Sequence, residues 1–205
     1  MREGIIFDVD GTMWDSTEIV KDAWNSVLIE ENIPLRLTEK QLQAEFGKAL
    51  EEIRDDLLPM FPMEQRNRIL QGWFRAEEAA LLERMPRVYD GLEEMLQALS
   101  ERYFLFVVSN AQSGYIELFL KKTGFGHYFQ DYTCNGDTGL PKAGNIRLMM
   151  DRFHLDEAVY VGDTQLDCTS AKEARAAFAY ASYGFGTADT WDYFLREVRD
   201  LRQLL

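Results

Sequence analysis

Hydrophobic positions along this chain form two kinds of pattern, short continuous runs and periodic faces. The first run, residues 5–7, is β-branched or aromatic and predicts a buried strand. Runs at residues 104–108, 158–161 and 178–181 predict three more buried strands, and residues 132–134 a weaker one. Three of these strands, those at residues 5–7, 104–108 and 158–161, end in polar residues.

From residue 16 to residue 84 the apolar spacing is helical throughout. Thr38 and Gln41 have the spacing of a capping box that opens one helix. Gly47 precedes a short helical stretch over residues 50–57, and Pro59 and Pro62 interrupt the pattern. A long helix then continues until Pro86.

After Pro86 helices alternate with strands. Asp90 and Glu93 resemble a cap for a helix with its apolar face at residues 92–99, and Gly124 is a plausible stop for a helix at residues 116–120. We also expect helices at residues 146–153, from about residue 170, and at the C-terminus after a Thr190 cap. The alternation predicts an α/β protein with a doubly wound parallel sheet.

The long helical stretch separates the first strand from the rest of the sheet. It is best interpreted as an all-helical insertion after strand one. We therefore expect a core formed by residues 1–14 and 86–205, and a helical cap formed by residues 15–85. In such sheets ligands bind at the carboxyl ends of the strands.

Composition and charge limit the classes of molecule that the chain is expected to bind and the compartment that it is expected to occupy. With 205 residues and 46% hydrophobic content the chain can bury a real core. A net charge of −13 argues against nucleic acid as a partner but permits a small phosphorylated metabolite. Cys134 and Cys168 are too far apart to indicate a zinc site or disulfide scaffold, which fits a reducing cytoplasm. No apolar run approaches the ~18 residues of a membrane span, so no membrane segment is expected. The sequence leaves the oligomeric state open.

Asp8 and Asp10 directly follow the first strand. Because they are two residues apart in an extended chain, their side chains point to the same side. Two neighbouring carboxylates repel each other unless a cation, a proton or hydrogen-bond donors compensate for their charge. Gly11 allows a close backbone turn. The pattern fits either a Mg²⁺ site with a nucleophile and a general acid/base, or a solvated loop.

The other strand ends carry weaker signals. Ser109 and Asn110 suit a phosphate oxygen, but also an ordinary turn or helix cap. Lys142, in a loop flanked by glycine and proline, can neutralise a phosphoryl group or be a solvated lysine. Asp163 and Asp167, at the start of a helix, suit either Mg²⁺ or the helix dipole.

Taken together and in this order, these signals resemble the four motifs of the haloacid dehalogenase-like hydrolase superfamily. The resemblance runs along the whole chain, with residues 8–12 as the first motif, residues 107–110 as the second, Lys142 as the third, and residues 161–164 with Asp167 as the fourth. Residues 13–16 resemble the start of the cap in phosphoglycolate phosphatase-like members.

The resemblance implies a role for each motif residue. Asp8 would be the nucleophile that forms an aspartyl-phosphate, and Asp10 the general acid/base. Mg²⁺ would be bound by Asp8, the backbone carbonyl of Asp10, and Asp163. The phosphoryl oxygens would be held by Ser109, Lys142 and backbone amides near Gly11 and Asn110, and Thr12 and Asp167 would support the site.

The second aspartate bears on the reaction. Dehalogenases of the superfamily lack an aspartate at the position of Asp10, because a halide needs no acid to leave, whereas an alkoxide does. Asp10 thus favours a phosphatase acting on small-molecule phosphate monoesters. A phosphomutase like β-phosphoglucomutase, or a non-catalytic regulatory protein on this fold, remain alternatives. Gly47 and Lys48 are candidates for a cap loop over the substrate, although Gly47 also suits a simple helix end.

Overall fold

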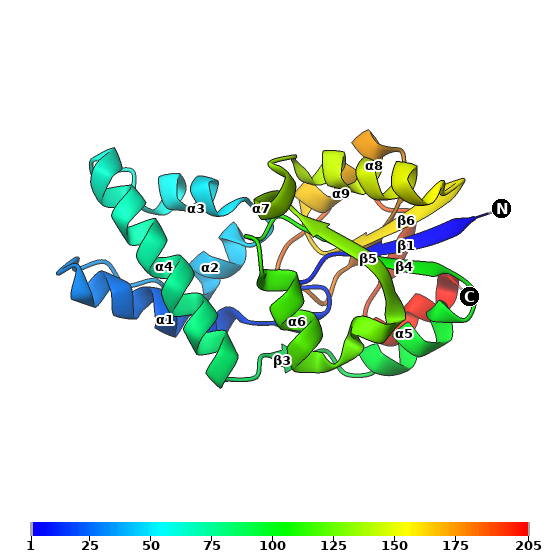
Figure 1. The fold of residues 1–205 in the computed structure, drawn as a ribbon, viewed down its shortest axis with the longest axis horizontal. Coiled ribbons are helices and arrows are strands. Elements are labelled where there is room, and N and C mark those ends of the chain that lie inside the picture. The colour runs from blue at the N-terminus through cyan, green and yellow to red at the C-terminus, as the bar shows by residue number, and fades with distance from the viewer. Residues whose placement is uncertain (1, 205) are drawn as a thin grey trace.

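The computed structural model describes residues 2–204 and is built around one parallel sheet (Figure 1). The strands lie in the order β5-β4-β1-β6-β7-β8, and every neighbouring pair is parallel. Their bounds are β1 Glu3–Phe7, β4 Phe104–Ser109, β5 Phe129–Cys134, β6 Glu157–Gly162, β7 Ala177–Ala181 and β8 Tyr193–Leu195. The order reverses at β1, and such switch points are where α/β sheets bind ligands.

Helices cover both faces of this sheet, so the predicted fold class is confirmed. Strand β1 shows why, because its successive side chains enter opposite cores: Ile5 and Phe7 one, and Ile6 the other. One face is covered by α5 (Leu92–Ser100), α6 (Tyr115–Thr123) and the 3₁₀ helices η1 (Phe125–Tyr128) and η2 (Val198–Leu204). The other is covered by α8 (Lys142–Phe153) and α9 (Gln165–Ala174). The short α7 (Asn135–Thr138) follows β5.

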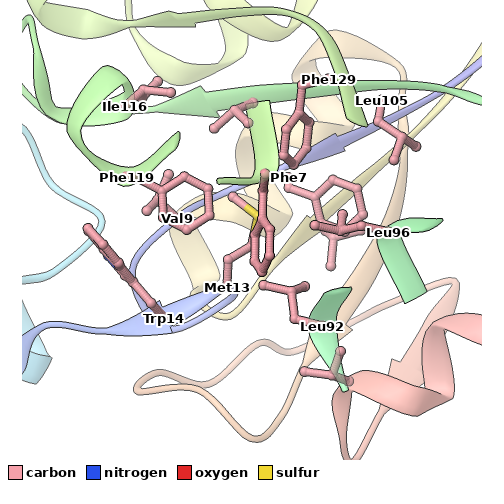
Figure 2. Packing of buried hydrophobic residues seen from close by; sticks show 14 of the residues in the cluster. Phe7, Val9, Met13, Trp14, Leu92, Leu96, Leu105, Ile116, Phe119 and Phe129 are labelled. Atoms are coloured by element: carbon pink, nitrogen blue, oxygen red, sulfur yellow. The ribbon is translucent and has the colours of Figure 1, made fainter. Parts of the chain in front are cut away.

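The larger core fixes the chain on both sides of the first motif. Phe7 packs edge-to-face with Phe129, with ring centroids 6.2 Å apart, and Trp14 packs in the same way on Phe119 at 4.9 Å (Figure 2). Val9 and Met13 are fully buried between these rings. The loop between Phe7 and Trp14 is therefore held at both ends by packed side chains.

The four helices that follow β1 in the sequence pack around a core of their own, at the left of Figure 1. They are α1 (Thr17–Glu30), α2 (Glu39–Glu45), α3 (Leu50–Leu57) and α4 (Met63–Glu83). Trp24 of α1 stacks on Trp73 of α4, with ring centroids 4.5 Å apart. Two short antiparallel strands, β2 (Trp14–Asp15) and β3 (Arg87–Val88), join this unit to the sheet. The division into a core and a cap domain stays a prediction.

Two of the predicted helix ends are confirmed, one with a side-chain cap and one with a glycine in the left-handed conformation. The Thr38–Gln41 capping box is confirmed at α2, and Gly124 ends α6 with a φ of 77°. The Asp90–Glu93 cap is wrong, because α5 begins after Gly91 in a left-handed conformation without a side-chain cap. The expected start of a helix near residue 170 is also wrong, since α9 already begins at Gln165, whereas the expectation that Asp163 and Asp167 lie at a helix start is confirmed.

The predicted C-terminal helix is wrong as well. Tyr193–Leu195 forms β8 at the edge of the sheet, and a 3₁₀ helix follows. The Asp192 carboxylate accepts a hydrogen bond from the backbone N–H of Phe178 at 2.8 Å, which draws the segment onto β7. Backbone pairing of β8 with β7 therefore outweighs the helical spacing of Trp191, Phe194 and Val198.

Across residues 2–204, none of the helices combines the length and apolar character needed to cross a membrane. The cytoplasmic location stays a prediction.

Candidate active site

The first motif lies at the carboxyl end of the central strand. In the register of the sheet Phe7 is level with Val107 of β4 and Val161 of β6. Asp8, one residue further, accordingly comes close to the ends of both neighbouring strands. The parallel sheet thus brings together three polar segments that are far apart in the sequence and begin at Asp8, Ser109 and Asp163.

Lys142 connects two carboxylates at this edge. Its Nζ donates to Asp8 at 2.9 Å and to Asp167 at 2.6 Å, and all three side chains are buried. The expectation that Lys142 lies in a loop is wrong: it is the first residue of α8, directly after Pro141. Burial lowers the pKa of Lys142, but Asp167 and Asp8 outweigh it, so the pKa rises and the ammonium stays charged.

Asp167 uses its two carboxylate oxygens differently. One accepts from Lys142, and the other accepts from the backbone N–H groups of Asp163 and Thr164 at 3.1 and 2.9 Å. The Thr164 hydroxyl in turn accepts from the Asp167 N–H, which completes a capping box at α9. Asp167 therefore holds Lys142 and the start of α9 in one fixed arrangement.

The Asp163 carboxylate packs against two glycines, at positions where a larger side chain would clash with it. A Cβ on Gly11 would be 2.2 Å from the Asp163 carboxylate, and one on Gly184 would be 2.6 Å from it. The Phe185 N–H donates to the same carboxylate at 2.7 Å. Gly11, with a φ of 75°, thus lets the first-motif loop approach Asp163 closely.

These carboxylates carry more negative charge than the site neutralises. Asp8, Asp163 and Asp167 each offer an oxygen within 4.8 Å of the others, and all are buried. When all three are ionised, the single positive charge of Lys142 leaves two negative charges. Burial raises the pKa of Asp8 to about 7 despite Lys142, and burial with two neighbouring carboxylates raises the pKa of Asp163. The residues present therefore fit a hard divalent cation with oxygen ligands.

The Asp10 side chain points to a different set of partners. One carboxylate oxygen accepts from Trp14 Nε1 at 3.0 Å, Ser16 Oγ at 2.7 Å and the Tyr115 hydroxyl at 2.7 Å. Its side chain is not in the acidic cluster, as expected if only its backbone carbonyl were a metal ligand. Burial raises the pKa of Asp10, and the three donors limit that rise.

Ser109 and Asn110 have local partners of the kind that a turn provides. The Ser109 hydroxyl accepts from the Ala111 N–H at 3.2 Å. Asn110 Nδ2 donates to the carbonyl of Gly47 at 2.7 Å, which joins the end of β4 to the helical unit. Within residues 2–204, Asn110 Oδ1 and Thr12 Oγ1 are buried without a hydrogen-bond partner.

A small cavity lies between the sheet edge and the helical unit. Asp8, Asp10, Ser109 and Asn110 line it from the sheet, and Gly47, Lys48, Trp24 and Glu77 from the helices. Its volume is about 40 Å³, enough for only a few waters, since one needs roughly 10–15 Å³. The predicted residues Gly47 and Lys48 thus do face the first motif. Gly47 has a φ of 94° in the turn that follows α2, which fits a helix end, and its role in a loop over the substrate stays a prediction.

Sequence reasoning missed two residues at this cavity, Tyr115 and Glu77. Tyr115 is the first residue of α6 and lies behind Asp10; an aromatic residue there looks like an ordinary core position. Glu77 occupies the buried face of α4 between Trp73 and Leu81. A charged residue four positions after one core residue and four before another was the signal that would have revealed it.

Comparison with known proteins agrees with the resemblance seen in the sequence motifs. The chain matches the family of haloacid dehalogenase-like hydrolases over residues 5–181. It is 25% identical over 209 residues to pyrophosphatase PpaX of Listeria monocytogenes serotype 4a, covering 96% of this chain and 93% of that one. It is 27% identical over 190 residues to a phosphoglycolate phosphatase of Cereibacter sphaeroides, covering 89% and 86%.

The fold is shared with solved structures. A predicted phosphoglycolate phosphatase from Haemophilus somnus 129pt superposes with a TM-score of 0.87 at 22% identity, covering 99% of this chain and 97% of that one. The family match spans both sides of the helical unit and includes every motif described above. The chain therefore belongs to the haloacid dehalogenase-like hydrolase family, and the sequence-based assignment to this family of enzymes is confirmed.

Proposed function

We propose that this protein is a Mg²⁺-dependent phosphatase of small-molecule phosphate monoesters that works through an aspartyl-phosphate on Asp8. The observation that carries the proposal is the separation of the two aspartates. Asp8 is paired with Lys142, whereas Asp10 is held by neutral donors from Trp14, Ser16 and Tyr115. Two neighbouring carboxylates in such different surroundings suit two different roles.

In the first half-reaction an Asp8 oxygen attacks phosphorus, and the bond from phosphorus to the ester oxygen breaks. Asp10 gives its proton to that oxygen, which leaves as an alcohol. Burial raises the pKa of Asp10 and so favours the protonated acid that this step needs. In the second half-reaction Asp10 takes a proton from water, which attacks phosphorus and releases phosphate from Asp8.

Asp8, Asp163 and the backbone carbonyl of Asp10 are the proposed Mg²⁺ ligands. Bound there, the cation would offset repulsion between the Asp8 carboxylate and the phosphate dianion. The excess of two negative charges and the glycine-lined pocket around Asp163 support this assignment. Asp167, with both oxygens already engaged, is proposed to position Lys142 and α9.

Lys142, Ser109 and backbone amides near Gly11 and Asn110 are proposed to bind the phosphoryl oxygens. Lys142 already contacts the nucleophile, so it can neutralise a phosphoryl group bonded to Asp8. The helical unit, residues 15–85, is proposed to act as a cap. Its Gly47–Lys48 turn lines the cavity, and we expect the cap to move to admit a phosphate ester, because a volume of about 40 Å³ holds only a few waters.

Phosphate release from a generic aryl phosphate, with and without Mg²⁺, tests this function. We expect turnover that chelation abolishes and that Asp8→Asn eliminates while the protein stays folded. Glu78→Gln, on the exposed side of α4, is the matched control and should retain activity. Full activity in Asp8→Asn would refute the covalent mechanism.

A panel of metabolites then identifies the substrate class. Phosphoglycolate and pyrophosphate belong in it because relatives carry those names. A phosphomutase would share all of these residues. It would instead need a bisphosphate activator and would release little phosphate from a sugar phosphate.

A further inference from the structure

Helix α4 carries a buried carboxyl group that the proposed chemistry does not use. Glu77 is only 5% exposed and lines the same cavity as Asp8 and Asp10. One of its oxygens accepts from Trp24 Nε1 at 2.8 Å, and the other from Gln112 Nε2 at 3.1 Å. Each oxygen has one donor and so retains the capacity to accept a second hydrogen bond.

No cation in the described part of the chain pairs with Glu77. Its two donors, an indole and an amide, are both neutral. Lys48 also lines the cavity, but it is bound to Glu45 at 2.6 Å and to Asp56 at 2.7 Å. Burial raises the pKa of Glu77 to about 7, so above this pH the side of the cavity formed by the helical unit presents uncompensated negative charge.

The position of Glu77 determines which part of a bound substrate would contact it. A phosphoryl group bonded to Asp8 lies against the sheet edge, where Lys142 and the proposed metal ligands are. Once the cap has moved to admit the ester, the rest of the ester extends away from the sheet toward the helical unit, on the side where Glu77 lines the cavity. Glu77 thus faces the leaving group rather than the phosphate.

From this geometry we propose that Glu77 selects the leaving group: it favours small alcohols that donate a hydrogen bond and carry no negative charge, and it rejects anionic ones. The inference rests on the proposed phosphatase function and specifies its substrate class. A hydroxyl or ammonium group can donate to the free lone pairs of Glu77. A carboxylate leaving group would bring a second negative charge into a site with little water to screen it.

Three phosphate esters of matched size test this proposal: 2-phosphoglycolate, 2-hydroxyethyl phosphate and O-phosphoethanolamine. Their leaving groups are alike except for a negative, zero or positive charge. We expect kcat/KM for the neutral and cationic esters to exceed that for phosphoglycolate at least about tenfold at pH 8, given the strength of charge repulsion in a poorly screened site. Where hydrolysis is slow, competitive inhibition of aryl phosphate turnover measures the same order.

Glu77→Gln removes the charge and keeps the shape. In this variant the preference should fall to within about threefold, since charge repulsion in a poorly screened site is its cause. Glu78→Gln, its exposed neighbour, should keep the native preference. A general loss of stability would lower all three rates together, so the ratio between esters isolates the role in recognition.

The native protein alone can overturn the proposal. If it hydrolyses phosphoglycolate as well as the neutral ester, or better, Glu77 does not reject anions. An unchanged ratio in Glu77→Gln would overturn it equally. Absence of phosphate release from every ester, aryl phosphate included, would instead refute the proposed function and this inference with it.

Discussion

Glu77→Gln should make the free energy of unfolding of the protein depend less on pH. Burial raises the pKa of Glu77 from 4.5 to about 7, although Gln112 and Trp24 donate to it. Below pH 4.5 the carboxyl is protonated in both the folded and the unfolded protein. Between pH 4.5 and 7 it is ionised mainly in the unfolded protein, so its contribution to folding is lost as pH rises through this window.

The size of this loss follows from the shift itself. A rise from 4.5 to about 7 corresponds to about 3 kcal/mol, at 1.36 kcal/mol for each pKa unit. In a chain of this length that is a change in Tm of roughly 6–12 °C. The amide introduced by Glu77→Gln does not titrate, so the native protein should lose this stability relative to the variant as pH rises from 4.5 to about 7.

Urea unfolding in chelator at several pH values measures this difference. Asp8 and Asp163 also have raised pKa values, but they are present in both proteins and cancel in the comparison. The charge of Asp10 adds to the rise in the pKa of Glu77, so its effect on Glu77 is part of the measured difference. Glu78→Gln controls for the loss of one surface charge. Parallel stability curves for the native protein and Glu77→Gln would show that Glu77 titrates normally and that the reasoning from burial is wrong.

Three further outcomes are expected. Mg²⁺ at a hundred times its Kd should stabilise the native protein by about 2.7 kcal/mol in unfolding experiments, and Asp163→Asn should lose this gain. Tyr115→Phe removes one donor to Asp10 and should lower kcat about five- to tenfold and raise the upper pH limit of activity, because one interaction that favours the ionised acid is gone. Gly11→Ala places a Cβ 2.2 Å from Asp163 and should abolish Mg²⁺-dependent stabilisation, as calorimetry would show.

The sheet and the place of the site could be predicted because both depend on local sequence. Continuous apolar runs identified four of the strands of the sheet and a weaker run a fifth, and polar residues after them marked the strand ends. The edge strand β8 was missed because its pairing depends on a distant contact, the bond from Phe178 to Asp192. Helical spacing was the only signal in the sequence there, and tertiary pairing overrides it.

Sequence patterns likewise could not reveal those contacts of the candidate site that depend on tertiary packing. The four motifs indicated which side chains come together, and the contacts of Lys142 with Asp8 and Asp167 join residues 134 and 25 positions apart. The motifs did not reveal Tyr115 or Glu77, because each lies on a helix where its neighbours have the ordinary apolar spacing. Their partners, Asp10 and Trp24, are brought near only by packing.

The contacts around the cavity also bear on how it opens. Asn110 donates to Gly47, Gln112 donates to Glu77, and the ring of Phe46 lies 5.4 Å from that of Phe185. At roughly 1 kcal/mol each, these three contacts total about 3 kcal/mol. We expect an open form separated by that amount to be populated at the level of about 1% or less, which is enough for a substrate to select it. Because Phe185 also donates to Asp163 through its backbone N–H, the proposed closure of the cap and the position of the proposed metal ligand would depend on the same residue.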